Sequence, residues 1–155
     1  MGGRAQFEQY CKDNGLDINI IELDKSTRTA QLAAEAIGTE LGSIVKSLVF
    51  LADGRLALVL IAGDRRADTK KLAQVLEAKK VKIADADTVR EETGFAIGGV
   101  PPVGHHTSLP TLVDRSLSRF ETVYAAAGSP HAVFPVAYDV LLQVTAGQVA
   151  DVTED

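Results

Sequence analysis

Lys46 is the residue of this chain whose position most directly suggests chemistry. It lies in residues 44–51, a run whose other members are apolar or small, as is typical of a buried strand. A lysine ammonium at the head of such a strand offers three hydrogen-bond donors to a carbonyl, a hydroxyl or a phosphate. The same position also suits a lysine whose stem follows the strand and whose ammonium reaches solvent. The strand pattern leaves both interpretations open.

A loop rich in glycine and proline, residues 94–104, follows further along the chain. Its adjacent glycines, Gly98 and Gly99, can bring backbone N–H groups close to a ligand because no Cβ stands in the way. Such groups bind an anion or stabilise an oxyanion that develops during a reaction. Pro101 and Pro102 would keep the loop rigid. The alternative is a tight connection from a helix to a strand, in which the glycines adopt positive φ angles.

Composition limits the class of protein. The 155 residues suit one domain, 1–155, and an apolar content of 46% is that of a globular chain. The apolar runs are too short to span a membrane, and we expect no secretory signal at the N-terminus. With the single cysteine Cys11 no intrachain disulfide can form, so we expect a cytoplasmic protein. The net charge of −5 argues against broad phosphate binding but allows a local basic face.

Hydrophobic periodicity and turn residues predict alternating helices and strands without strict β-α-β order. The Asp53-Gly54 pair indicates a hairpin turn, and Asp68 and Asp139 are expected to cap helices. We therefore expect a single-domain mixed α/β fold in which helices surround a curled or barrel-like sheet. Helices are expected over 1–14, 30–37, 68–78, 87–93 and 140–145, and strands over 17–23, 45–51, 55–62, 81–84, 111–114, 122–126 and 132–136.

Two segments together resemble the YbaK/EbsC-type aminoacyl-tRNA deacylases, the free-standing relatives of the prolyl-tRNA synthetase editing domain. Residues 44–48 read Ile-Val-Lys-Ser-Leu, which is similar to the family pattern Val-x-Lys-[Ser/Thr/Ala]-Leu. Residues 93–104 match the pattern Thr-Gly-[Tyr/Phe]-x-x-Gly-Gly-x-x-Pro-x-Gly at each fixed position. The order and separation of segments agree over residues 20–144, so the resemblance covers most of the chain.

The resemblance implies hydrolysis of the ester that joins a wrong amino acid to the 3′-terminal adenosine of tRNA. It implies no metal and no cofactor, and one cysteine with three histidines gives no zinc-like spacing. Lys46 would bind the aminoacyl ester or the terminal phosphate. The N–H groups of Gly98 and Gly99 would stabilise the oxyanion, and water activated by the ribose hydroxyl would attack. Cys11 is interpreted as a small apolar residue rather than a nucleophile.

A second group of residues is assigned to substrate binding through the same resemblance. Thr29 has a competing interpretation as the N-cap of the helix that follows it, and we favour that interpretation. His131 is either a turn residue or a neutral imidazole that hydrogen-bonds the substrate ammonium or the attacking water. His105 and His106 are expected to be exposed or to lie near the RNA backbone. The predicted substrate-binding residues are Thr29, Pro102, Gly104, Gly128 and His131.

The partner implied by the resemblance is the 3′-aminoacyl end of tRNA, with prolyl-tRNA synthetase as a candidate second partner and no membrane. The expected substrate is tRNA(Pro) charged with a small wrong residue, alanine first and cysteine second, while serine, threonine and 2-aminobutyrate stay open. A non-catalytic aminoacyl-tRNA or nucleotide-binding module is the alternative, and a DNA-binding regulator a weaker one. A basic stretch is either a solvated face or a contact to the acceptor stem: Arg65, Arg66, Lys70, Lys71, Lys79, Lys80 and Lys82.

Overall fold

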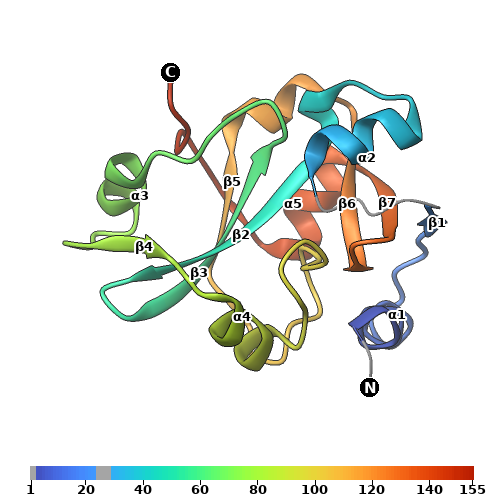
Figure 1. Ribbon diagram of the computed structural model, residues 1–155, viewed down its shortest axis with the longest axis horizontal. Coiled ribbons are helices and arrows are strands. Elements are labelled where there is room, and N and C mark those ends of the chain that lie inside the picture. The colour runs from blue at the N-terminus through green and yellow to red at the C-terminus, as the bar shows by residue number, and fades with distance from the viewer. Residues whose placement is uncertain (1–2, 24–28) are drawn as a thin grey trace.

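The computed structural model describes residues 3–23 and 29–155, and within them the chain forms two β-sheets flanked by helices (Figure 1). The helices are α1 (Gly3–Asp13), α2 (Ala30–Ile37), α3 (Thr69–Val75), α4 (Ala86–Thr93) and α5 (Tyr138–Thr145), with 3-10 turns η1 (Leu41–Ser43) and η2 (Arg115–Arg119). The strands are β1 (Ile21–Glu22), β2 (Val45–Ala52), β3 (Arg55–Ala62), β4 (Val81–Ile83), β5 (Thr111–Asp114), β6 (Thr122–Ser129), β7 (Ala132–Ala137) and β8 (Gln148–Ala150).

The larger sheet has the strand order β4-β2-β3-β5-β8 and is mixed. Strands β2 and β3 form an antiparallel hairpin, and β5 and β8 continue the sheet in parallel. The hairpin turn is made by Asp53 and Gly54, both with positive φ (51° and 83°), as the two-residue turns that match strand twist require. The Asp53 carboxylate also accepts hydrogen bonds from the Lys79 and Lys80 N–H groups, which fixes β4 beside the hairpin.

The smaller sheet has the order β1-β7-β6 and is antiparallel. A single parallel bridge between Ile44 and Tyr124 links the two sheets at one end. The main core fills the space between them, with Phe7 of α1, Val45 of β2 and Phe134 of β7 among its buried members. A second core, which includes Leu72 of α3, covers the opposite face of the larger sheet. The predicted mixed α/β fold is confirmed, although the described strands form two sheets and do not close into one barrel.

Most predicted elements are present with shifted ends. The helix before Gly38 and the Asp53-Gly54 hairpin lie where they were expected. Two details are wrong: Asp139 lies in the first turn of α5, whose N-cap is Ala137, and the strand expected over 17–23 is reduced to Ile21–Glu22. Strand β8 was not anticipated. In the described part of the chain, no helix is long and apolar enough to cross a membrane.

Asp114 fastens the C-terminal segment to the larger sheet. Its carboxylate is almost fully buried at the end of β5. One oxygen accepts from the Val152 N–H at 2.9 Å, and the other accepts from the Ser116 N–H at 3.0 Å and from Thr153 Oγ1 at 3.2 Å. The Ser116 hydroxyl donates to that second oxygen as well. The side chain therefore joins β5, η2 and the residues after β8.

Candidate functional site

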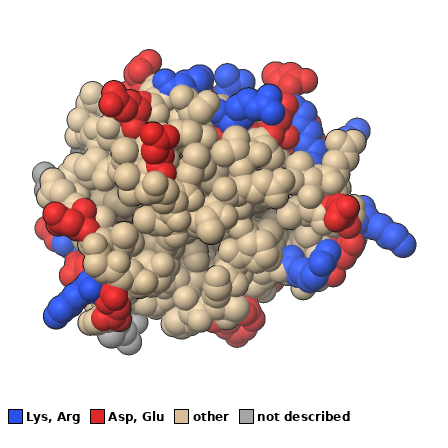
Figure 2. Space-filling view, turned by 180° about the vertical axis from the view of Figure 1, so that it is seen from behind, with Lys and Arg blue, Asp and Glu red and all other residues tan. Residues whose placement is uncertain are grey.

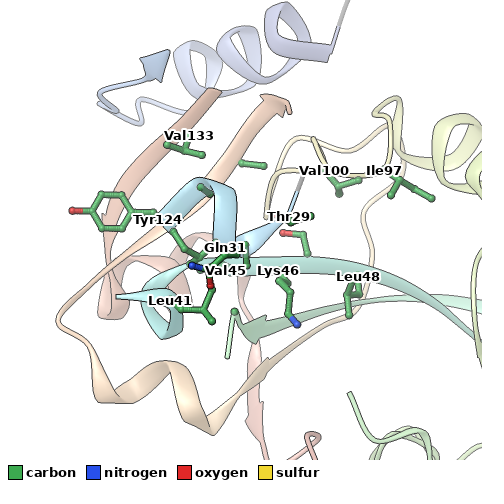
Figure 3. A pocket seen from close by; sticks show the side chains of 17 residues that line it. Thr29, Gln31, Leu41, Val45, Lys46, Leu48, Ile97, Val100, Tyr124 and Val133 are labelled. Carbon is green, nitrogen blue, oxygen red and sulfur yellow. The ribbon is translucent and has the colours of Figure 1, made fainter. Parts of the chain in front are cut away.

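A cavity of about 400 Å³ lies between strand β2 of the larger sheet and strands β6 and β7 of the smaller one. Figure 3 shows β2 on one side of it, Tyr124 and Val133 on another, and the loop with Ile97 and Val100 above. The first residues of α2 close the remaining side. The lining residues are Thr29, Ala30, Gln31, Ala33, Leu41, Ile44, Val45, Lys46, Ser47, Leu48, Gly63, Ile97, Gly98, Val100, Tyr124, Ala126 and Val133.

The cavity lies against the free edge of β2. Five consecutive residues, 44–48, line it, although side chains of a strand alternate between opposite faces. A cavity can meet consecutive strand residues only where it contacts the strand from the side. In the described chain, β4 pairs with β2 only from Phe50 onward, and the bridge from Ile44 to Tyr124 reaches only the start of β2. Residues 46–48 therefore pair with no described strand on that side.

The direction of the main-chain groups on this edge follows from the neighbouring hydrogen bonds. The Val49 carbonyl accepts from the Ala84 N–H at 2.9 Å, on the side away from β3. The N–H and C=O groups of alternate strand residues point the same way, so those of Ser47 also point away from β3. Consistently, the N–H of Leu58, the partner of Val49, donates to Pro110 rather than to β2. Among the described residues, the Ser47 N–H and C=O groups on this side therefore pair with no neighbouring strand.

Lys46 lines this cavity, as predicted, but its ammonium is already held. Its Nζ donates to the Arg65 carbonyl at 2.6 Å, and its other two hydrogens have no partner among the described residues. In Figure 3 its nitrogen points away from Thr29 and from the loop with Val100. Lys46 thus lies at one end of the cavity, next to the turn after β3.

Burial lowers the pKa of the Lys46 ammonium, and the positive charge of Arg66 lowers it further. Asp64 acts in the opposite direction and raises this pKa. The pKa of Asp64 is itself lowered by Arg119, whose guanidinium binds both carboxylate oxygens at 2.7 and 3.0 Å. A fork of this kind fixes the orientation of both groups. The end of the cavity next to Lys46 is therefore an ordered cluster in which cations outnumber the single carboxylate.

The two glycines of the loop have different environments. Gly98 lines the cavity with φ of 90°, and the Ala96 carbonyl accepts from the Gly99 N–H at 3.0 Å, which makes residues 96–99 a β-turn. Positive φ at the third residue of such a turn favours glycine. A Cβ on Gly99 would lie only 3.0–3.1 Å from the Ser129 backbone. Gly98 therefore faces the cavity, whereas Gly99 serves the turn and allows the loop to approach β6.

The predicted substrate-binding residues are spread over several places. Thr29 lines the cavity, and its Oγ1 also accepts from the Leu32 N–H, so it caps α2 as we expected. Pro102 and Gly104 line a separate cavity of about 130 Å³. Gly128 packs on Gly3, and His131 is exposed at the turn between β6 and β7. Of these residues only Thr29 contacts the same cavity as Lys46 and Gly98.

Two further predictions concern groups that titrate. His105 is not exposed: its Nε2 lies 2.7 Å from the Pro101 carbonyl, its ring meets Phe95 edge-on, and burial lowers its pKa. His105 therefore stiffens the loop, whereas His106 is exposed as expected. Cys11 is buried, and burial raises the pKa of its thiol to about 11, as suits the interpretation as a small apolar residue. The described residues contain no cluster of His, Cys, Asp and Glu that could hold a metal ion.

The basic stretch divides into separate groups. Arg65 and Arg66 lie beside Lys46, although neither lines the cavity. Lys80 precedes β4 and Lys82 lies within it, at the far end of β2. Lys71 is bound by Asp151, Asp155 and the Thr153 carbonyl. Figure 2 shows one face of the molecule on which charged side chains of both signs lie around the margin and leave the centre uncharged. Among the described residues of this stretch, Arg65 and Arg66 are the ones that interact with Lys46.

Sequence reasoning missed several lining residues. Tyr124, Ala126 and Val133 come from strands that it placed but could not orient, and Gln31 and Ala33 come from α2. Ser47 was read only as a motif position beside Lys46. Its hydroxyl is shielded from solvent and has no hydrogen-bond partner among the described residues. The sequence signal that could have drawn attention to Ser47 is its polar side chain inside the largely apolar run 44–51.

Comparisons with known proteins agree on one family. A family model described as "Aminoacyl-tRNA editing domain" matches residues 24–144. The chain is 38% identical over 127 residues to "Uncharacterized protein YwhH" of Bacillus subtilis (strain 168), covering 81% of this chain and 78% of that protein. It is 30% identical over 126 residues to "Putative Cys-tRNA(Pro)/Cys-tRNA(Cys) deacylase EbsC" of Enterococcus faecalis, covering 81% and 77%.

A solved structure matches the whole chain. It is described as "Crystal structure of a putative trans-editing enzyme for prolyl tRNA synthetase". The TM-score is 0.94 at 41% sequence identity, and the match covers 100% of this chain and 99% of the other. The two chains therefore share the same fold over nearly their full lengths.

Proposed function

Because this chain belongs to the family of aminoacyl-tRNA editing domains, we propose that it is a trans-editing hydrolase that deacylates mischarged aminoacyl-tRNA. The observation that carries the proposal is the cavity itself. It combines a cation, a free strand edge and a glycine N–H, and it is open enough for the terminal adenosine and its ester. These groups suit an ester with a neighbouring phosphate and ammonium.

In this mechanism Lys46 binds the ester or the terminal phosphate with the hydrogens that Arg65 does not use. The Gly98 N–H is the donor proposed for the oxyanion, because Gly98 lines the cavity and the Gly99 N–H is occupied by Ala96. Gly99 allows the close approach that places Gly98. Thr29 holds the start of α2 at the cavity wall. Water performs the attack, activated by the neighbouring ribose hydroxyl of the substrate.

Two relatives suggest the substrate. The EbsC name specifies cysteine on tRNA(Pro) or tRNA(Cys), and the matching structure is described as acting for prolyl-tRNA synthetase. We propose tRNA(Pro) carrying a small wrong residue, with alanine and cysteine as the first two candidates. Prolyl-tRNA synthetase is the proposed second partner, because it produces the mischarged species.

Deacylation assays test the function. The purified protein is incubated with tRNA(Pro) charged with alanine, cysteine, serine, threonine or proline, and the ester that remains is measured over time. We expect multiple turnover of at least one mischarged species and sparing of the proline ester. Tight binding without turnover of any ester would instead support a non-catalytic binding module.

The division of the basic residues predicts where tRNA phosphates bind. Arg66→Gln is expected to weaken tRNA binding and to reduce the slope of log affinity against log salt by about one, as the loss of one phosphate contact does. Lys80→Gln, which removes the same charge at the far end of β2, is the matched control and should leave the slope unchanged. Binding is measured by fluorescence anisotropy at several salt concentrations. Equal effects of both variants would contradict the assignment.

A further inference from the structure

The Gln6 side chain joins the two ends of the loop that carries Gly98. Its amide nitrogen donates to the Thr93 carbonyl at 3.0 Å and to the Gly104 carbonyl at 2.9 Å. An amide NH₂ group has two hydrogens, so both are used. The His106 N–H donates to the same Thr93 carbonyl at 3.0 Å. The base of this loop is therefore closed by a residue of the N-terminal helix α1.

The loop leaves room for this amide because residue 94 is a glycine. A Cβ on Gly94 would clash with the Gln6 amide and would lie 2.6 Å from the Nε2 atom of His106. The helix that carries the amide is held by a separate contact, since its residue Phe7 is fully buried in the main core. Gln6 thus projects from a fixed helix into a space that the loop keeps free for it.

A short and well-packed stretch of chain connects the loop base to Gly98. The buried Thr93 hydroxyl donates to the Val89 carbonyl at 2.6 Å and accepts from the Phe95 N–H at 3.0 Å. Phe95 is itself buried, and the turn 96–99 begins at the next residue. Two residues separate Phe95 from Gly98. Closely packed groups transmit a displacement rather than absorb it, so a shift of the loop base also moves Gly98.

We propose that Gln6 is a positioning residue, whose amide closes the loop base and thereby sets where the Gly98 N–H lies in the cavity. The inference rests on the proposed editing function, in which that N–H stabilises the developing oxyanion. Gln6 does not line the cavity, so it acts through the loop alone. It also precedes residues 24–144, the part of the chain that the family model matches, and neither sequence motif includes it.

The kinetic test compares Gln6→Met with the wild-type protein. Methionine keeps an unbranched side chain but cannot donate to either carbonyl. We expect kcat for the preferred mischarged tRNA to fall at least about tenfold, because a small misplacement of a catalytic group can cost up to about a hundredfold. KM should change less than about twofold, since the lost alignment concerns the transition state rather than the bound substrate. An unchanged kcat, or a loss carried by KM, would overturn the proposal.

Gln9→Met is the matched control for this variant. Gln9 lies on the same helix and is exposed, and its amide nitrogen bonds the Asp13 carboxylate within α1. The same substitution should therefore leave kcat at the wild-type value. An equal fall of kcat in both variants would show that the effect comes from the helix as a whole and not from the Gln6 amide.

Amide hydrogen exchange, followed by NMR without tRNA, separates this inference from the editing function. In Gln6→Met the N–H groups of Gly99 and His106 should exchange at least about tenfold faster, because the loop opens more often. The Ala84 N–H, which donates to the Val49 carbonyl, should keep its rate. This pattern supports the role of Gln6 even if no ester is turned over. Unchanged exchange in the loop, or faster exchange at all three sites, refutes it even if deacylation is fast.

Discussion

Lys46→Ala is expected to lower kcat/KM for deacylation of the preferred mischarged tRNA at least about a hundredfold, the range found when one donor to a developing charge is removed. The Lys46 ammonium lies at one end of the cavity, and the Arg65 carbonyl uses one of its hydrogens. The bidentate ion pair between Asp64 and Arg119 holds the surrounding charged cluster in place. Removing it takes away a charge-assisted hydrogen bond to the ester or phosphate. The value of kcat/KM is obtained from initial rates at several tRNA concentrations.

Two companion variants separate charge from packing. Lys46→Met keeps most of the aliphatic stem and should be as inactive as Lys46→Ala, whereas Lys46→Arg keeps the charge and should retain part of the activity. Thermal melts of all three variants check that the fold is kept. If Lys46→Met is nearly as active as the wild type, the ammonium has no role in the reaction.

The pH dependence follows from the same group. An ammonium that donates to the substrate contributes fully below its pKa, and its contribution is lost as the pH rises through that pKa. Burial and Arg66 lower the pKa of Lys46, so the loss should begin at a lower pH than for an exposed lysine. The rate ratio of wild type to Lys46→Met should therefore fall with rising pH. A ratio that stays constant to high pH would exclude this role.

Asp114→Ala is expected to cost about 3–5 kcal/mol in the free energy of unfolding, because several buried donors lose their acceptor at once. Domains of this size are stable by only about 5–15 kcal/mol, so the variant should be close to unfolding. The C-terminal segment should loosen first, since Val152 and Thr153 lose their attachment to β5. Urea denaturation followed by circular dichroism measures the loss.

The control for Asp114 is Asp17→Ala. Asp17 is exposed, and its removal should change the free energy of unfolding by less than about 0.5 kcal/mol. Asp114→Asn should have an intermediate effect on the free energy of unfolding. Its amide keeps one oxygen acceptor, but its NH₂ group would face N–H and O–H donors that need an acceptor. A loss for Asp114→Ala no larger than that for Asp17→Ala would mean that the C-terminal segment is held by its apolar contacts alone.

The local features of the fold could be predicted because each has a local cause. The Asp53-Gly54 turn, the Gly38 stop and the Asp68 cap act through neighbouring residues, and all three are present. The long motif at 93–104 and the strand with Lys46 indicated the family. Strand β8 could not be found this way, because Gln148–Ala150 is short and becomes a strand only by pairing with β5.

The arrangement of the site depended on distant contacts that the sequence does not display. Which glycine faces the cavity is decided by the approach of the loop to Ser129. Similarly, the environment of Lys46 depends on the turn after β3, which brings the Arg65 carbonyl to its ammonium. The contact between His105 and the Pro101 carbonyl depends on how the loop folds back on itself. The sequence does not display that fold, so His105 was expected on the surface.

The free edge of β2 also has a consequence for how this protein behaves at high concentration. An unpaired strand edge is a template on which another chain can add a strand, and this is a common route to aggregation. Here the edge lies at the bottom of a cavity enclosed by α2, β6 and the turn at Gly98. A second protein strand with flanking side chains is too bulky to enter, whereas a single aminoacyl group is not. The walls of this cavity thus also keep the chain from polymerising through the edge of β2.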